Sequence, residues 1–119
     1  MKKPIWLDVP EDHDYPAAES YLNLILDPTV AAMQVAKLRD APVSQFKAKD
    51  IVRAAQLTML TDENKHVARN LSKIEAGKPL SPVLLMRGSN MRLIIADGYH
   101  RSCAVYLNDE DAVVPCKIV

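Results

Sequence analysis

The amino-terminal third of the chain carries apolar residues at helical spacing. Asp14 is a suitable N-cap, and the apolar run that follows forms one side of a helix that Asp27 and Pro28 end. A second helix is expected to begin at Thr29, where apolar and polar positions alternate at helical spacing until Pro42. The first 42 residues are therefore predicted to form an extended entry segment over residues 1–13, followed by a helical pair.

In the middle of the chain the pattern changes twice. Residues 43–48 alternate apolar and polar side chains, which predicts a short strand. Asp50 can cap a brief helix that reaches Leu57. After a loop, Thr61 can cap a longer helix, with apolar residues at positions i, i+4 and i+7, that ends at Gly77.

The last third reads as strands around one helix. Residues 82–86 are a continuous apolar run, and the Gly-Ser-Asn turn at 88–90 joins them to a second strand at 91–96, which predicts a hairpin. A helix at 99–107 and a final strand at 113–119 complete the chain. The order of elements predicts one α+β domain over residues 1–119, built on a small mixed sheet with packed helices.

Composition narrows the function without defining it. Fifteen Lys and Arg balance fifteen Asp and Glu, so the net charge is zero, whereas a nucleic-acid binder usually has a basic excess. Cys103 and Cys116 lack the spacing of a disulfide framework or zinc site and are expected to be packing residues. Since neither a signal peptide nor a membrane-spanning run is visible, we expect a cytoplasmic protein with no membrane partner.

The most informative stretch joins an apolar strand to a helix through Asp97, Gly98, Tyr99, His100 and Arg101. Gly98 allows a ligand to approach the backbone, the helix start offers unpaired N–H groups, and the imidazole and guanidinium can bond phosphate oxygens. Asp97 could cap the helix or hold a metal ion. A cap and a surface ion pair between Asp97 and Arg101 would explain the same residues without a ligand.

Basic residues elsewhere allow two interpretations. Lys65, His66, Arg69 and Lys73 form one stripe of the helix that follows Thr61, opposite its apolar side. The stripe is either a solvated face or a source of side chains that reach the phosphate. Lys49 allows the same two interpretations.

Residues 43–119 resemble the ParB/sulfiredoxin superfamily. Three segments carry the resemblance: Gly77–Leu85, Ile94–Arg101 and Val114–Val119. The resemblance implies a small α+β fold in which a helix N-terminus binds nucleotide phosphates, often with magnesium. By rough alignment it also implies that Lys65, His66 and Arg69 face the nucleotide.

Departures from the family pattern restrict the activity. Sulfiredoxins carry their reactive cysteine where this chain has Tyr99, so repair of sulfinic acids is disfavoured. Chromosome-partition members carry arginines where this chain has His100 and Cys103, which disfavours DNA partitioning. The Asp-Gly-Tyr-His-Arg motif is closer to small stand-alone members, which include kinase-like enzymes acting on free serine. Residues 1–42 lie outside the resemblance.

The sequence therefore predicts a ParB/sulfiredoxin-like domain that binds a nucleotide or another phosphate-containing small molecule. ATP or another nucleoside triphosphate with magnesium is the expected cofactor, and a weak phosphotransferase or phosphohydrolase activity is the expected chemistry. No positioned base or nucleophile is visible, so a non-catalytic regulatory or interaction module is the alternative. A nuclease or DNA-binding protein is the least favoured class. The amino-terminal helices could also build a homodimer.

Overall fold

A computed structural model of the chain describes residues 2–119. Its main sheet has the order β2-β6-β4-β5, with antiparallel pairing of β2 with β6 and of β4 with β5, and parallel pairing of β4 with β6. The four strands are β2 (Ser44–Lys47), β4 (Val83–Arg87), β5 (Leu93–Asp97) and β6 (Val113–Ile118). The α+β class, the mixed sheet and the hairpin are confirmed.

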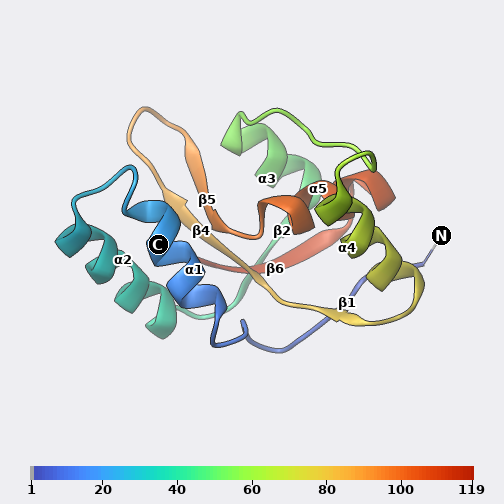
Figure 1. Cartoon of the computed structure of the whole chain (residues 1–119), viewed down its shortest axis with the longest axis horizontal. Coiled ribbons are helices and arrows are strands. Elements are labelled where there is room, and N and C mark those ends of the chain that lie inside the picture. Colours follow the sequence, from blue (N-terminus) through green and yellow to red (C-terminus); the bar gives the residue numbers. More distant parts are fainter. Residues whose placement is uncertain (1) are drawn as a thin grey trace.

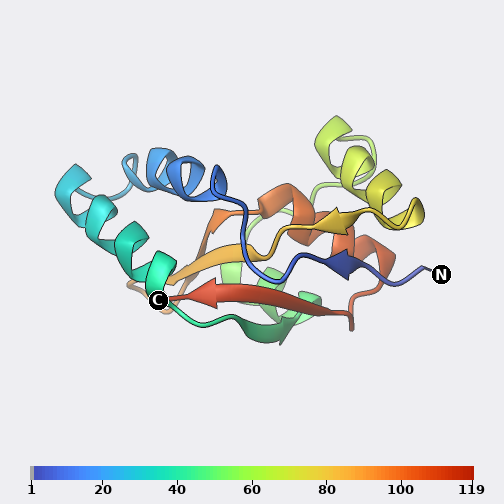
Figure 2. The same ribbon diagram turned by 90° about the horizontal axis from the view of Figure 1, so that it is seen from below.

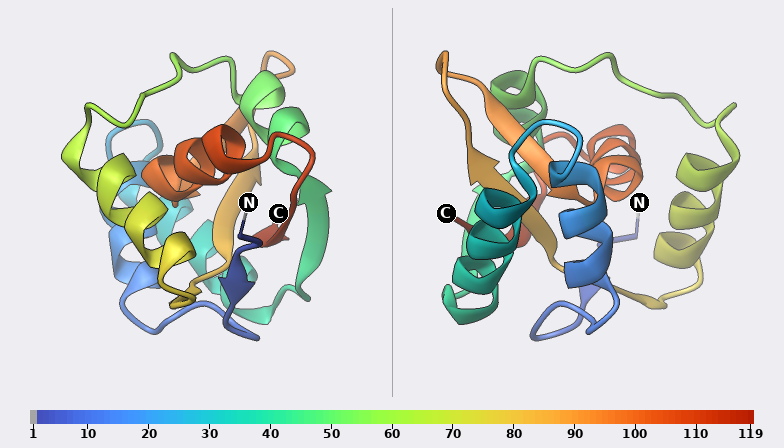
Figure 3. Two further views of the ribbon diagram at one scale, coloured as in Figure 1. Left: turned by 90° about the vertical axis from the view of Figure 1, so that its right-hand side faces the viewer. Right: turned by 60° about the vertical axis from the view of Figure 1, so that its left-hand side comes forward.

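Helices cover both faces of this sheet. Figure 1 and Figure 3 show α1 and α2 together on one side and α3, α4 and α5 on the other. The helices are α1 (Asp14–Leu22), α2 (Pro28–Asp40), α3 (Ala48–Ala55), α4 (Lys65–Glu75) and α5 (Tyr99–Asn108). None of these helices combines the length and apolar character needed to cross a membrane.

The central strand β4 explains the two helical layers. Successive side chains of a strand point to opposite faces. Val83 and Leu85 pack into a core with α3 and α5, whereas Leu84 and Met86 pack into a second core with α1 and α2. All four side chains are buried. A strand that is apolar on both faces requires cover on both sides, and the predicted helical pair provides the second cover.

A small second sheet ties down the amino terminus. β1 (Ile5–Trp6) pairs in parallel with β3 (Pro79–Leu80), and the two strands run side by side in Figure 2. Sequence analysis missed this pairing because two residues are too few for a periodic pattern. The pairing fixes the path of the chain into α1, beside the segment that enters β4.

The first helix is shorter than predicted. It ends at Leu22, and the N–H groups of Leu24 and Leu26 bond back to Tyr21 and Leu22 in a turn. Leu24 is 83% exposed, so part of the apolar run faces away from the core. The predicted N-cap role of Asp14 is also wrong, because Asp14 is the first helical residue and its side chain is buried.

The starts of the later helices also differ from the prediction. The second helix begins at Pro28, capped by Asp27, one residue before the predicted start. The third begins at Ala48, after Lys47, so Asp50 lies inside the first turn instead of capping it. The spacing of apolar residues predicted helix starts near Thr29 and Asp50. Helix ends vary by one or two residues, so such a pattern does not fix the first residue.

The N-cap of α4 is Asn64, and the prediction of Thr61 was wrong. The Asn64 side-chain oxygen accepts the N–H groups of His66 at 2.9 Å and Val67 at 3.2 Å. The Thr61 hydroxyl accepts only the N–H of Glu63, in the preceding loop. The cap therefore fixes the start of the helix that carries the basic stripe.

The hairpin turn is wider than predicted and delays the second strand. Asn90 and Met91 both adopt positive φ, and the Gly88 N–H donates to the Arg92 carbonyl at 2.9 Å. β5 therefore begins at Leu93 and not at Met91.

Replacing Asn64 should destabilise the protein more than replacing Thr61. Asn64→Ala removes an acceptor for two helix N–H groups and should lower the free energy of unfolding by about 1 kcal/mol. The control Thr61→Ala should cost less than about 0.5 kcal/mol because its contact lies outside the helix. Urea unfolding followed by circular dichroism measures both, and equal losses would contradict this assignment of the cap.

Candidate functional site

The junction between β5 and α5 is formed by a glycine that no other residue can replace without strain. Gly98 has a φ of +104° and is the N-cap of α5. A Cβ at this position would lie 2.5 Å from the Val83 Cγ1 atom, within overlap of β4. No side chain caps α5, so the predicted alternative of a cap from Asp97 is wrong. The helix start keeps backbone donors available for a ligand.

Arg101 is bonded to groups at the base of the junction. Its Nη2 atom lies 3.3 Å from the Asp97 Oδ2 atom and donates to the Pro82 carbonyl at 3.4 Å. The Arg101 and Asp97 side chains are 17% and 19% exposed, so their ion pair is largely shielded from water. The Arg101 Nε atom is buried and has no hydrogen-bond acceptor within residues 2–119. The predicted i, i+4 pair is therefore present, and it leaves the buried Nε donor without an acceptor.

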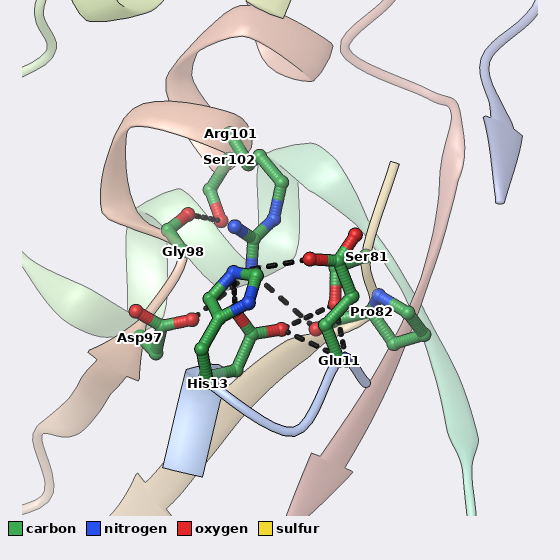
Figure 4. Close-up of polar contacts among 9 residues, drawn as sticks. Glu11, His13, Ser81, Pro82, Asp97, Gly98, Arg101 and Ser102 are labelled. Carbon is green, nitrogen blue, oxygen red and sulfur yellow. Dashed lines mark hydrogen bonds and ion pairs between the residues drawn. The ribbon is translucent and has the colours of Figure 1, made fainter. Parts of the chain in front are cut away.

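A second buried carboxylate, that of Asp14, lies against this pair. Its Oδ2 atom accepts the Ser81 hydroxyl and the Glu11 N–H, the latter at 3.2 Å. The His13 Nε2 atom lies 3.4 Å from Asp14 Oδ1 and 3.0 Å from Glu11 Oε2. Figure 4 shows Glu11, His13 and Ser81 around the end of the Arg101 side chain. The start of α1 thus brings acidic and imidazole groups to the α5 junction.

The environment of Asp97 favours its protonated form. Burial raises the pKa of Asp97 above 3.8, and the charge of Asp14 and a hydrogen bond with it act in the same direction. The Arg101 guanidinium opposes this shift but does not cancel it. Burial penalises the charged form of a carboxyl group, and a second carboxylate adds to the penalty. Asp97 is therefore a more basic carboxylate than an exposed aspartate.

A basic pocket of about 220 Å³ opens beside the junction. Side chains of α4 form one wall, and the α5 junction forms the other. The lining residues are His66, Arg69, Asn70, Lys73 and Asp97 to Arg101. The centroids of the His66 and His100 rings lie 4.9 Å apart in the pocket wall. Burial, and then the neighbouring His66, lower the pKa of His100.

The structure brings most of the predicted residues together and leaves two apart. His66, Arg69 and the five junction residues all line the pocket, whereas Lys65 and Lys49 do not. The Lys49 Nζ atom lies 2.6 Å from Asp111 Oδ1, and this contact raises the pKa of the lysine. The Tyr99 hydroxyl donates to the Thr58 carbonyl, so this hydroxyl is already used in holding the loop before α4.

Sequence reasoning missed the residues that approach from the amino-terminal segment. His13 was given no role, Asp14 was predicted as a cap, and Glu11 was not singled out. Asp14 and Ser81 are 67 residues apart in sequence, and no local pattern links them. Asn70 could have been found, since it lies four residues after His66 on the basic stripe and donates to the His66 carbonyl.

The remaining metal-binding and nucleophilic candidates add nothing to this site. Cys103 and Cys116 are buried and unpaired, as expected for packing residues. Burial raises the pKa of Cys103, and it raises the pKa of Cys116 to about 11, so neither thiol readily becomes a thiolate. In the described part of the chain, no group of three or more His, Cys, Asp or Glu side chains is placed to hold a metal ion.

No protein-family model, curated protein or solved structure matches this chain. The resemblance to the ParB/sulfiredoxin superfamily therefore remains a prediction from three sequence segments. The geometry of the pocket is the basis for inferring a function.

Gly98→Ala should destabilise the protein by about 3 kcal/mol. Alanine at this position would be strained by the positive φ, and its Cβ would also overlap Val83. Gly77→Ala is a matched control, because Gly77 also has positive φ but its Cβ would meet only Ile5 Cδ1, at 3.9 Å. This control should cost about 1 kcal/mol. Chemical unfolding compares the two variants, and equal losses would show that the contact with Val83 is unimportant.

The raised pKa of Asp97 predicts a pH dependence of stability. The folded protein holds this proton more tightly than the unfolded chain, so the carboxyl stabilises the fold below pH 3.8. That contribution is lost as the pH rises through the pKa of the folded state. The free energy of unfolding of the wild type, relative to Asp97→Asn, should therefore fall as the pH rises above 3.8. A difference that instead rises with pH in urea titrations would contradict the sign of the shift.

Proposed function

We propose that the basic pocket binds the phosphoryl groups of a nucleotide or another phosphorylated small molecule. The observation that carries this proposal is the meeting of five basic side chains with the uncapped start of α5. These side chains belong to His66, Arg69, Lys73, His100 and Arg101. Helix N–H groups and guanidinium groups are both strong donors to phosphate oxygens.

The unused donor of Arg101 supports an anionic ligand. A buried N–H without an acceptor costs roughly 1–3 kcal/mol. The Nε atom is buried, and Arg101 belongs to the pocket wall. A phosphate that drew the Arg101 side chain away from Asp97 would supply the missing acceptor. Binding would then recover a cost that the free protein carries.

The size of the pocket indicates which part of the ligand it would enclose. Ligand pockets are usually about 300–1,000 Å³, whereas this one is about 220 Å³. A pocket of this size and polarity encloses phosphoryl groups, and the rest of a nucleotide such as ATP would lie outside it. Affinity should then depend more on the phosphate chain than on the base.

The buried carboxylates offer the base that sequence analysis did not find. Asp97 lines the pocket, and its raised pKa makes it a better proton acceptor than an exposed aspartate. In this proposal Asp97 takes the proton of an attacking hydroxyl or water, and Arg101 keeps the carboxylate oriented. Asp14 positions the pair from behind. The reaction class is transfer or hydrolysis of a phosphoryl group.

Magnesium would be compatible with this arrangement. Mg²⁺ is usually held by one or two carboxylates together with substrate phosphates. Asp97 is the carboxylate that lines the pocket, so it would hold the ion beside the phosphates in the absence of a role as base, because a bound cation lowers the pKa of a carboxylate. When bound, the ion would neutralise part of the phosphate charge.

A ligand sensor without chemistry is the second candidate. It is favoured by the ion pair between Arg101 and Asp97, whose 3.3 Å contact an incoming phosphate would compete with. Loss of this pair on binding could change how α1 packs, because Asp14 lies beside it. Only turnover separates this candidate from an enzyme.

Replacing Arg69 should weaken binding of ATP or inorganic pyrophosphate. Arg69→Gln keeps a polar side chain and removes the charge, so affinity should fall about tenfold or more. Arg53→Gln is the control, because Arg53 lies on α3, is 85% exposed and is absent from the pocket wall. Isothermal titration calorimetry with magnesium present measures both. A wild-type protein that binds neither ligand at millimolar concentration would end the proposal.

The same samples distinguish the two candidates. ADP formation from ATP by the wild type, lost in Asp97→Asn while pyrophosphate still binds, would support an enzyme. Binding without ADP formation, both alone and with free serine as acceptor, would support the sensor. Equal ADP formation by the wild type and Asp97→Asn would remove Asp97 from the role of base.

A further inference from the structure

A second cavity, of about 450 Å³, lies at the opposite end of β5 from the basic pocket. β5 begins at Leu93, in the wall of this cavity, and ends at Asp97, in the wall of the basic pocket. The two have no lining residue in common. The cavity lies beside α3, where the β4–β5 hairpin projects past the helices in Figure 3.

The walls of this cavity are mainly apolar. The four strands of the main sheet and α3 contribute apolar side chains, which are Phe46, Ile51, Leu85, Leu93 and Ile118. The Phe46 residue is 40% exposed, an unusual position for an aromatic ring on a strand. The volume lies within the range of small-molecule sites.

Three charged side chains reach the cavity, and two of them are already paired. Asp50 bonds the Arg53 guanidinium at 3.3 Å. Arg92 donates from Nε to the Ala55 carbonyl at 3.0 Å and from Nη2 to the Gln56 carbonyl at 3.2 Å. Those two carbonyls lie at the end of α3, so Arg92 has a structural task.

Arg87 is the third charged side chain, and it is exposed. Within residues 2–119 its guanidinium forms no ion pair with a carboxylate side chain. Its backbone N–H donates to the Val119 oxygen at 2.8 Å. The cavity thus combines an apolar wall with one exposed planar cation.

We propose that this cavity binds a small organic carboxylate with an aromatic or aliphatic body. The body would pack against Phe46, Leu93 and Ile118, and the carboxylate would bond the Arg87 guanidinium. One guanidinium matches one carboxylate in a bidentate pair, which favours a monoanion over a polyphosphate. This ligand site is separate from the proposed phosphate pocket and does not depend on it.

Indole-3-acetate and octanoate are suitable probes, and neutral indole-3-acetamide is the chemical control. Titrations followed by two-dimensional NMR should give saturable shifts at residues around Phe46 and Leu93. Arg87→Gln should weaken indole-3-acetate binding about tenfold or more, because a charged hydrogen-bond partner is lost. Lys37→Gln, exposed on α2 and outside the cavity wall, should change the affinity less than twofold. The acetamide should bind at least tenfold more weakly than the acid.

A filling substitution gives an independent test of the place of binding. Ala54 lines the cavity and is exposed, so Ala54→Trp should block binding and leave the protein folded. The proposal is overturned if neither carboxylate binds at millimolar concentration, or if Arg87→Gln binds as well as the wild type. It is also overturned if pyrophosphate displaces the carboxylate, since the ligand would then occupy the basic pocket. Shifts at the same residues on raising the protein concentration alone would assign the cavity to a second copy of the chain.

Discussion

The burial of β4 on both faces is the constraint on which the rest of the structure depends. Val83 and Leu85 face one core, and Leu84 and Met86 face the other, so one layer of helices cannot shield the strand from water. The amino-terminal helical pair supplies the missing layer. Because α1 must lie across β5 to do this, its first residue arrives next to the end of β5. The packing requirement therefore also delivers Asp14 to the candidate site.

The close contact of Gly98 with Val83 places the start of α5 against β4, where a ligand can reach its N–H groups. It lets α5 start directly at the end of β5 and keeps the helix start free of a capping side chain. Arg101, one turn into the helix, then pairs with Asp97, and both line the pocket together with the basic residues of α4. The Asp14 carboxylate interacts with Asp97 from outside the pocket wall. A chain with no net charge thereby has a locally cationic pocket beside a buried acidic pair.

Arg92 near the start of β5 and Tyr99 after its end both bond the segment between α3 and α4. Arg92 holds the carbonyls that end α3, and the loop that follows is bonded by the Tyr99 hydroxyl before it reaches α4. The position of the basic stripe therefore depends on contacts made far from the stripe. Helix start and loop path are set together, which is why Asn64 and not Thr61 caps α4.

The sequence by itself determined the elements whose signals are local. The strands, the hairpin, the Asp97–Arg101 junction and the basic face of α4 all follow from periodicity, turn residues and spacing within a few positions. Tertiary structure alone decided that Glu11, His13 and Asp14 reach Ser81, and that Lys49 binds Asp111 away from the pocket. It also decided the pairing of β1 with β3 and the formation of the apolar cavity around Arg87. The physical reason is that these features depend on contacts between segments distant in sequence, which form only when both faces of one strand are covered.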